Sequence, residues 1–522
     1  MSGARDAARR NSAIDGRRRT LRGTVAALAA ALVGLGAPAL AQDQPPPADH
    51  APPPAGDLPA PDAGQTVAPP LPVQEQPLTP LDIFSTGRDT GLGPDLWKGA
   101  SADLARAVIP SLVDHPLSPA AAALARRVLA AAATAPAGAG ADATLGAARA
   151  RALLALGDAE TATMILDHAA NVAQNAALAE TAAEAALIND EDDKACAIGE
   201  ALAVDRDAAY WLRLRAFCQA RAGKPAAQLT FSLAQEQGKD PVFARMLPVI
   251  IAGAGDPGPA SLRNGLDYAM SRNLKLDLGP ALADAAPPIA ARLAPAPEAA
   301  AAPPAEADVL AALRAAKTPT AYAAAARLAL PGIVQLVQAK GALANPVQLA
   351  TAALAAHDPA TAQAIRTSLT ADSVPGASPT DLAILDAALA VAGGQADAPS
   401  LDRLIERGGA GDAKEAARAQ QAAAFVLALG WPVDPSAFAA FADFNLGRAQ
   451  AAPARLVALD SAADRAVVGD AALLALAIAE AGGEAGPSAG DRAQIIRALD
   501  RAGLKTDARG LAIEGLIDLE SR

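Results

Sequence analysis

Turn signals recur at a fixed interval in the first half of this 522-residue chain. They centre on positions 157, 190, 223 and 256, which lie 33 residues apart, within the pairs Gly157-Asp158, Asn189-Asp190, Gly223-Lys224 and Gly255-Asp256. Each signal separates apolar stretches of about a dozen residues, a length typical of one helix. A period of roughly 20–50 residues built from pairs of helices indicates a helical-repeat array, or solenoid.

The composition agrees with helices. Hydrophobic residues make up 52% of the chain but aromatic residues only 3%. Because alanine, rather than Val, Ile, Phe or Tyr, supplies most of the apolar content, the composition argues against extensive β-sheet. Alanine is the best helix former, and the 41 Gly and 42 Pro residues punctuate the helices. We therefore expect an all-α fold, an α-solenoid of antiparallel helical hairpins in two blocks.

The predicted units resemble the tetratricopeptide family, whose repeat is a pair of antiparallel helices of about 34 residues. Gly157-Asp158 stands where the family has its turn between helices, and Ala162, Leu166 and Ala169 stand at its small, bulky and small packing positions. Similar series are Gly223, Ala227, Phe231 and Ala234, and, near the end of the chain, Gly503, Ala508 and Ala512. The family's first-helix Trp and Tyr are mostly absent, so a related helical-hairpin array fits equally well. In the second half, His357-Asp358, Gly393-Gly394 and Gly503 are predicted turns without a constant spacing.

The N-terminus is typical of a secretory signal peptide. Seven arginines precede a twelve-residue apolar run at residues 25–36, and Ala39-Leu40-Ala41 follows it. The run is too short to span a bilayer, and small residues mark a cleavage site. We expect cleavage between Ala41 and Gln42, a periplasmic or secreted protein, and no transmembrane segment after cleavage. Removal of residues 1–41 leaves 37 basic and 54 acidic residues, a net charge of −17, which disfavours nucleic acid as a partner.

Proline-rich stretches divide the mature chain. Residues 42–80 contain thirteen prolines and no Lys or Arg, a composition that favours extended polyproline conformations and acts as a spacer. A second Pro/Ala-rich break spans residues 286–307. We therefore predict a signal peptide (1–41), a disordered linker (42–95), an N-terminal helical block (96–285), the break (286–307) and a C-terminal helical block (308–522).

The two cysteines are predicted to form a disulfide. Cys196 lies early in the helix that follows Asp190, and Cys218 lies late in the next helix, which runs back antiparallel. This places both at comparable heights, and an oxidising exported compartment permits the bond. Two buried reduced thiols are the alternative.

No catalytic or cofactor-binding motif is found, so we expect a protein that is not an enzyme and binds no cofactor or metal. The four histidines stand apart from any nucleophile or metal-binding spacing. The acidic run Asp190-Glu191-Asp192-Asp193 suggests calcium, but it lacks the glycine-bearing spacing of an EF-hand loop. Carboxylates are also favoured at a helix start, and this structural interpretation is preferred.

Large aromatic residues gather in two groups, and we interpret them as core anchors rather than binding patches because large aromatics dominate core energetics. The groups are Tyr210, Trp211, Phe217, Phe231 and Phe243, and Phe425, Trp431, Phe438, Phe441 and Phe444.

The sequence thus predicts a periplasmic scaffold or adaptor that binds protein or peptide partners in the cell envelope, with an interaction surface that the sequence does not identify. An alternative is a ligand-binding or accessory component of an envelope enzyme system, with its groove near residues 286–307. A remote alternative, an antifreeze-like protein, is suggested by alanine content alone. No three threonines follow the eleven-residue steps that such proteins use, so we discount it.

Overall fold

The computed structural model describes residues 82–294, 304–369, 374, 376–410 and 412–521. The predicted signal peptide, the Ala41–Gln42 cleavage site and residues 42–80 lie outside the described residues, as does the middle of the predicted break. The described part is helical, with a single parallel bridge between Arg88 and Ala131 as its only β pairing. The expected all-α class is confirmed.

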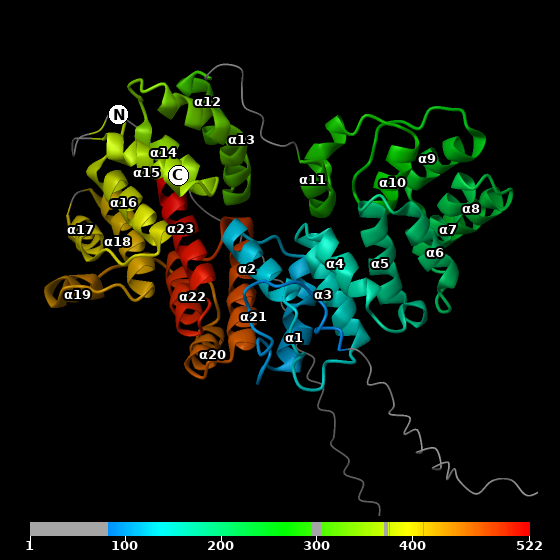
Figure 1. The fold of residues 1–522 in the computed structure, drawn as a ribbon, viewed down its shortest axis with the longest axis horizontal. Helices are drawn as coiled ribbons and strands as arrows, with labels where there is room; N and C mark the ends of the chain where they lie inside the picture. The colour runs from blue at the N-terminus through cyan, green and yellow to red at the C-terminus, as the bar shows by residue number, and fades with distance from the viewer. Residues whose placement is uncertain (1–81, 295–303, 370–373, 375, 411, 522) are drawn as a thin grey trace, which may run out of the picture. The chain divides into compact units, whose positions relative to one another are not determined.

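Eleven α-helices precede residue 295 in the described part (Figure 1). They are α1 (Ala102–Val108), α2 (Pro119–Ala130), α3 (Ala143–Ala155), α4 (Ala159–Asp167), α5 (Ala176–Ile188), α6 (Asp192–Ala201), α7 (Ala209–Arg221), α8 (Ala226–Gln237), α9 (Pro241–Ala252), α10 (Gly265–Asn273) and α11 (Pro287–Leu293).

Three tight hairpins follow the 33-residue spacing. The pairs α3–α4, α5–α6 and α7–α8 each pack together, and each turns at a residue in the left-handed region. These residues are Gly157 (φ 85°), Asp190 (φ 66°) and Gly223 (φ 63°). A left-handed residue ends a helix by bending the chain away from the helical path, and glycine adopts it without strain. At the fourth predicted turn, Gly255-Asp256, positive φ values occur at Gly255 and at the nearby Gly253 and Gly258, but not at position 256 itself.

After α8 the chain doubles back along its own first helices. Helix α9 packs against α7, α10 against α5, and α11 against α3 (Figure 1). The first helices of the three hairpins are therefore covered, in reverse order, by the segment that follows them.

Twelve α-helices follow residue 304 in the described part. They are α12 (Glu306–Ala315), α13 (Pro319–Gln338), α14 (Pro346–Ala355), α15 (Pro359–Ser368), α16 (Pro379–Gly393), α17 (Ala398–Gly408), α18 (Ala413–Ala428), α19 (Pro435–Ala442), α20 (Pro453–Asp464), α21 (Val468–Ala479), α22 (Ala489–Arg501) and α23 (Lys505–Ser521).

A second, slightly longer period organises these helices. Left-handed residues follow α14, α16, α18, α20 and α22 at intervals of 36 or 37 residues, at His357, Gly394, Gly430, Ala466 and Gly503. The sequence indicated the first, second and last of these turns. The spacing that looked irregular is therefore regular once the turns at Gly430 and Ala466 are included.

The last hairpin doubles back in the same way as α9–α11. Helix α22 packs against α18 and α20, and α23 packs against α14, α16 and α18. Helix α23 also contacts α2, while α1 and α2 pack against α21 (Figure 1). The first and last helices of the described chain thus share one core.

Residues before α1 already belong to this core. Ile83 and Phe84 are buried, and the Phe84 ring meets Trp97 edge-on with centroids 5.7 Å apart. Packing therefore begins well before residue 95, where the predicted linker ends.

A buried arginine fastens this early segment. The guanidinium of Arg149, on α3, is fully buried and donates hydrogen bonds to the backbone carbonyls of Leu129 (2.7 Å), Ile83 (2.7 Å) and Ala131 (2.9 Å). It also lies over the Phe84 ring, 5.0 Å from the centroid. Burial lowers the pKa of Arg149 to about 9. One side chain thus pairs three buried carbonyls that no helix satisfies.

One helix of the described residues, α13, is long and apolar enough to cross a membrane by length and composition, and 22% of its apolar window is buried. It packs against α12 and α14 and buries Ala326 and Ile333. Single helices of this kind also occur in the cores of soluble proteins, so the absence of a membrane span after signal cleavage stays a prediction.

Candidate functional site

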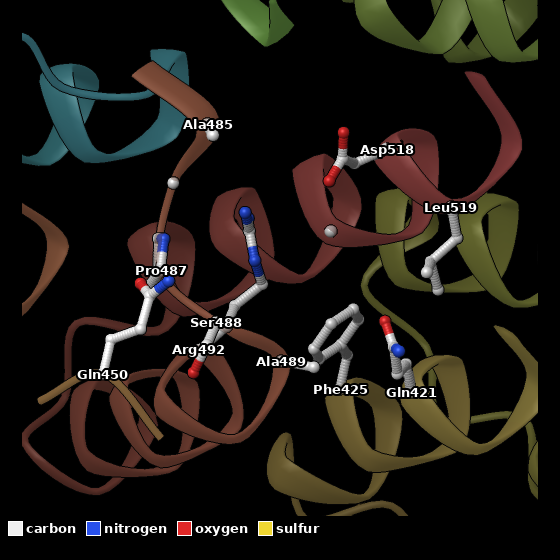
Figure 2. A pocket seen from close by; sticks show the side chains of 12 residues that line it. Gln421, Phe425, Gln450, Ala485, Pro487, Ser488, Ala489, Arg492, Asp518 and Leu519 are labelled. Carbon is white, nitrogen blue, oxygen red and sulfur yellow. The ribbon is translucent and has the colours of Figure 1, made fainter. Parts of the chain in front are cut away.

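A small cavity opens where α18, α22 and α23 meet (Figure 2). Its volume is about 190 Å³. Its polar lining comes from three helices and two loops: Gln421 on α18, Gln450, Ser488 at the start of α22, Arg492 on α22 and Asp518 on α23. Phe425, from α18, forms an apolar wall.

Two glycines make room for the cavity's central side chains. Gly515, on α23, lies against Phe425 and Arg492, and a Cβ there would come within 2.7 Å of the phenyl ring. Gly486 has φ 76°, and a Cβ there would lie 2.5 Å from a terminal nitrogen of Arg492. Pro487 follows and Ser488 caps α22, so the glycine-rich stretch after α21 ends one helix and positions the next.

Arg492 is fixed by a buried ion pair. Its guanidinium, 2% exposed, donates to Glu514 Oε1 at 2.8 Å and to the Leu511 carbonyl at 3.2 Å. It also lies 5.9 Å from the centroid of the Phe425 ring. Glu514 Oε2 in turn accepts the backbone N–H of Ala120 at 2.6 Å. The pair therefore links the wall of the cavity to the first turn of α2, which has no side-chain cap of its own.

Asp491, next to Arg492 on α22, joins the Gln450 loop to the start of α22. Its Oδ2 accepts hydrogen bonds from the backbone N–H groups of Gln450 (2.7 Å) and Ala451 (3.1 Å) and from the Ser488 hydroxyl (2.8 Å). Its Oδ1 is buried and has no partner in the described structure. Figure 2 shows the Arg492 side chain extending between the loop at Ala485 and Asp518.

The cavity presents hydrogen-bond donors and acceptors beside an aromatic ring, which suits a small polar ligand. Its lining residues include no His, Cys or Lys. The Ser488 hydroxyl donates to the Asp491 carboxylate and accepts the Asp491 backbone N–H, so it acts as the N-cap of α22.

Three further cavities lie elsewhere. One of about 600 Å³ lies between α15, α16 and α17, one of about 280 Å³ lies beside Cys196 and Cys218, and one of about 180 Å³ lies at the end of α23. None of the four is lined by described residues of the 286–307 break, where the ligand-binding hypothesis placed its groove.

The structure joins Cys196, on α6, to Cys218, on α7, in a disulfide with Cα atoms 5.7 Å apart. Both residues are half-buried. The bond connects the second hairpin to the third.

The acidic run at the start of α6 is surrounded by arginines. Asp190 accepts the hydroxyl of Tyr268 at 2.9 Å and pairs with Arg272 and Arg292. Asp192 pairs with Arg272 at 2.6 Å and with Arg221 at 3.7 Å. Within the described residues, no group of three or more His, Cys, Asp or Glu side chains has a metal-binding arrangement.

The three described histidines lie far apart along the chain. The rings of His115 and His168 contact backbone carbonyls four residues earlier, at 3.0 and 2.9 Å, and His357 occupies a left-handed turn. His50 lies outside the described residues.

The aromatic groups divide by burial. In the first group Trp211, Phe217 and Phe243 are buried, whereas Tyr210 and Phe231 are half-buried. In the second group only Phe425 and Trp431 are buried; Phe441 and Phe444 are half-buried, and Phe438 is 52% exposed. The core-anchor interpretation therefore does not extend to Phe438.

Sequence reasoning did not find Arg492, Glu514, Asp491 or Asp518. No motif marks them, because they come together only when α22 and α23 fold back. In comparisons with known proteins, no family model, no curated protein and no solved structure matches the chain.

Proposed function

We propose that this protein is a non-catalytic, exported helical-repeat scaffold or adaptor that mediates protein–protein interactions in the cell envelope. The observation that carries the proposal is the series of helical hairpins with left-handed turns at 33-residue and then 36- to 37-residue intervals. Stacked hairpins of this kind build extended surfaces that bind proteins and peptides. The N-terminal sequence supports export.

A tetratricopeptide-like relationship is part of this proposal. Six of the eight small and bulky positions that carry the resemblance are buried, whereas Ala169 and Phe231 are half-buried. The six buried positions are Ala162, Leu166, Ala227, Ala234, Ala508 and Ala512. This burial supports the relationship because the family uses these positions for packing within a repeat.

The helices that pack on the first helices of the hairpins limit which surface a protein partner can contact. Because α9–α11 and α22–α23 occupy the first helices of the hairpins, a partner meets the second helices instead. Helix α8 offers the clearest such surface: Leu229 and Leu233 are 66% and 44% exposed and lie four residues apart, on one face. Large exposed apolar residues on one helix face mark an interaction site.

Cross-linking tests the proposal. The tagged protein is cross-linked in intact envelopes, purified and compared with the double variant Leu229→Asp/Leu233→Asp. We expect one or a few defined proteins to be cross-linked to the wild type, and we expect these proteins to be absent from the purified double variant. The control Gln228→Asp/Ser232→Asp adds the same charge to neighbouring exposed positions of α8 and retains them. Recovery of no protein, or equal recovery from both variants, would contradict a scaffold role for α8.

A small-ligand-binding accessory role is the second candidate, and the cavity lined by Gln421, Arg492 and Asp518 favours it. Native mass spectrometry of protein purified from its own envelope tests this role. A bound small molecule that is lost in Gln421→Leu but kept in Gln363→Leu, in the cavity near α15, would support it. An empty wild-type protein would count against it.

A further inference from the structure

Helix α19 differs from the second helices of the other hairpins in its half of the chain. Helix α15 buries Ala362 and Ile365, and α17, α21 and α23 each bury several side chains. No residue of α19 is buried, and the helix packs mainly against α17. Helix α19 therefore has one face that no described part of the chain covers.

Three phenylalanines form a ladder on this helix and just after it. The Phe438 and Phe441 rings are nearly parallel, with an interplanar angle of 24° and centroids 6.4 Å apart. Phe441 meets Phe444 edge-on at 5.4 Å. Phe444 is anchored against Gly408, where a Cβ would lie 2.6 Å from its ring. Phe438, at the other end, is 52% exposed.

We call Phe438, Phe441 and Phe444 the aromatic ladder. Its Phe444 end packs against the protein, and its Phe438 end is exposed to solvent. Keeping a phenyl ring in water is unfavourable, because the hydrophobic effect favours its burial. Phe438 and Phe441 lie three residues apart and share one side of α19, and Phe444, two residues after the helix, contacts the Phe441 ring. Such an arrangement is typical of a surface that a ligand covers.

We propose that the aromatic ladder binds the chain's own proline-rich segment, residues 42–80. Aromatic-lined surfaces recognise proline-rich sequences in the polyproline conformation, whose rigid backbone loses little entropy on binding. The segment has thirteen prolines and no Lys or Arg. It therefore has no cationic side chain for cation–π contact with the phenyl rings, and its proline rings have to supply the apolar contact.

The segment is long enough to reach the ladder from its own chain. It joins the described structure at residue 82. At about 3.1 Å per residue, 39 residues in the polyproline conformation span about 120 Å. A compact domain of this size is roughly 60 Å across. The other proline-rich stretch, between α11 and α12, is joined at both ends to described helices and has much less reach.

Site-specific photo-cross-linking in the mature full-length chain tests the proposal. Phe438→p-benzoylphenylalanine is introduced, the purified protein is irradiated, and the cross-linked peptides are mapped by mass spectrometry. We expect cross-links to peptides within residues 42–80. The matched control is Leu229→p-benzoylphenylalanine, at an exposed apolar position on α8, which should give no cross-link to that segment.

Two additions identify the contact. Phe441→Ala in the Phe438-labelled protein should lower the yield severalfold, because it removes the middle ring of the ladder. An excess of a synthetic peptide of residues 66–80 should compete with the cross-link. The proposal would be overturned if position 438 cross-linked only to parts of the chain outside residues 42–80, or only to α19 of a second copy. It would also be overturned if position 438 gave no cross-link. It does not depend on the scaffold function, since the purified chain alone is tested.

Discussion

Replacing the buried Arg149 by methionine gives the most direct test of how the early segment is held. Methionine has similar length and is apolar, so the change removes the hydrogen bonds while filling most of the space. The carbonyls of Ile83, Leu129 and Ala131 lose their donor. Each buried acceptor left unpaired costs about 1–3 kcal/mol.

The desolvation penalty of the charge offsets part of this loss, because methionine no longer buries a cation. Burial already lowers the pKa of Arg149 to about 9, which shows that the charged form is disfavoured there. With three carbonyls affected, we expect a net loss of about 3 kcal/mol in the free energy of unfolding.

Urea unfolding followed by circular dichroism measures this difference. With a slope of about 3 kcal/mol/M, the midpoint should fall by about 1 M. The matched control is Arg151→Met, two residues further along α3, where the side chain is exposed; it should shift the midpoint little. Equal shifts of the urea midpoint in the two variants would refute the idea that the hydrogen bonds from Arg149 to these carbonyls stabilise the protein.

Three more predictions concern the Arg492–Glu514 ion pair, the disulfide and the buried Glu184. Glu514→Ala leaves the Arg492 charge buried without a partner and should cost about 3–5 kcal/mol, whereas Arg492→Met/Glu514→Leu should cost less in the same urea assay; a double variant worse than Glu514→Ala would argue against the ion pair. The disulfide closes a loop with a sequence separation of 22 residues, so Cys196→Ser/Cys218→Ser should cost about 3 kcal/mol, and reductant should destabilise the wild type but not this variant. Burial raises the pKa of Glu184, so its proton is held more tightly in the folded state, and its contribution to stability is present at pH 4 and falls as the pH rises through the raised pKa. Glu184→Gln still accepts the Gly265 N–H and should therefore be more stable than the wild type at pH 8 but similar at pH 4 in thermal melts; a constant difference across this range would exclude titration of Glu184 as the cause.

The helical class followed from composition, and the first three turns followed from their spacing. The turn at Ala466 could not be predicted, because alanine carries no preference for the left-handed region and only the packing of α20 against α21 imposes it. Gly430 was overlooked because Trp431 and Pro432 follow it without a polar turn residue.

The buried arginine was detectable in the sequence. Arg149 lies between Leu145 and Leu153, four residues from each, so helical periodicity places it on the apolar stripe of α3. By contrast, the cavity residues Gln450, Arg492 and Asp518 are distributed over more than sixty positions. They come together only because α22 and α23 pack against α18. The local sequence pattern of each helix does not indicate this long-range packing.

The doubling back of α23 onto α2 has a consequence for when the protein can fold. The N–H of Ala120 meets its acceptor on Glu514, 394 residues later in the sequence. During synthesis, α1 and α2 therefore have no complete set of partners until the last helix has been made. Contacts over so long a separation form slowly, because the intervening chain must first be ordered. The proposed export would use this property, because a nascent chain whose first helices stay undocked can still pass through a membrane channel in the unfolded state.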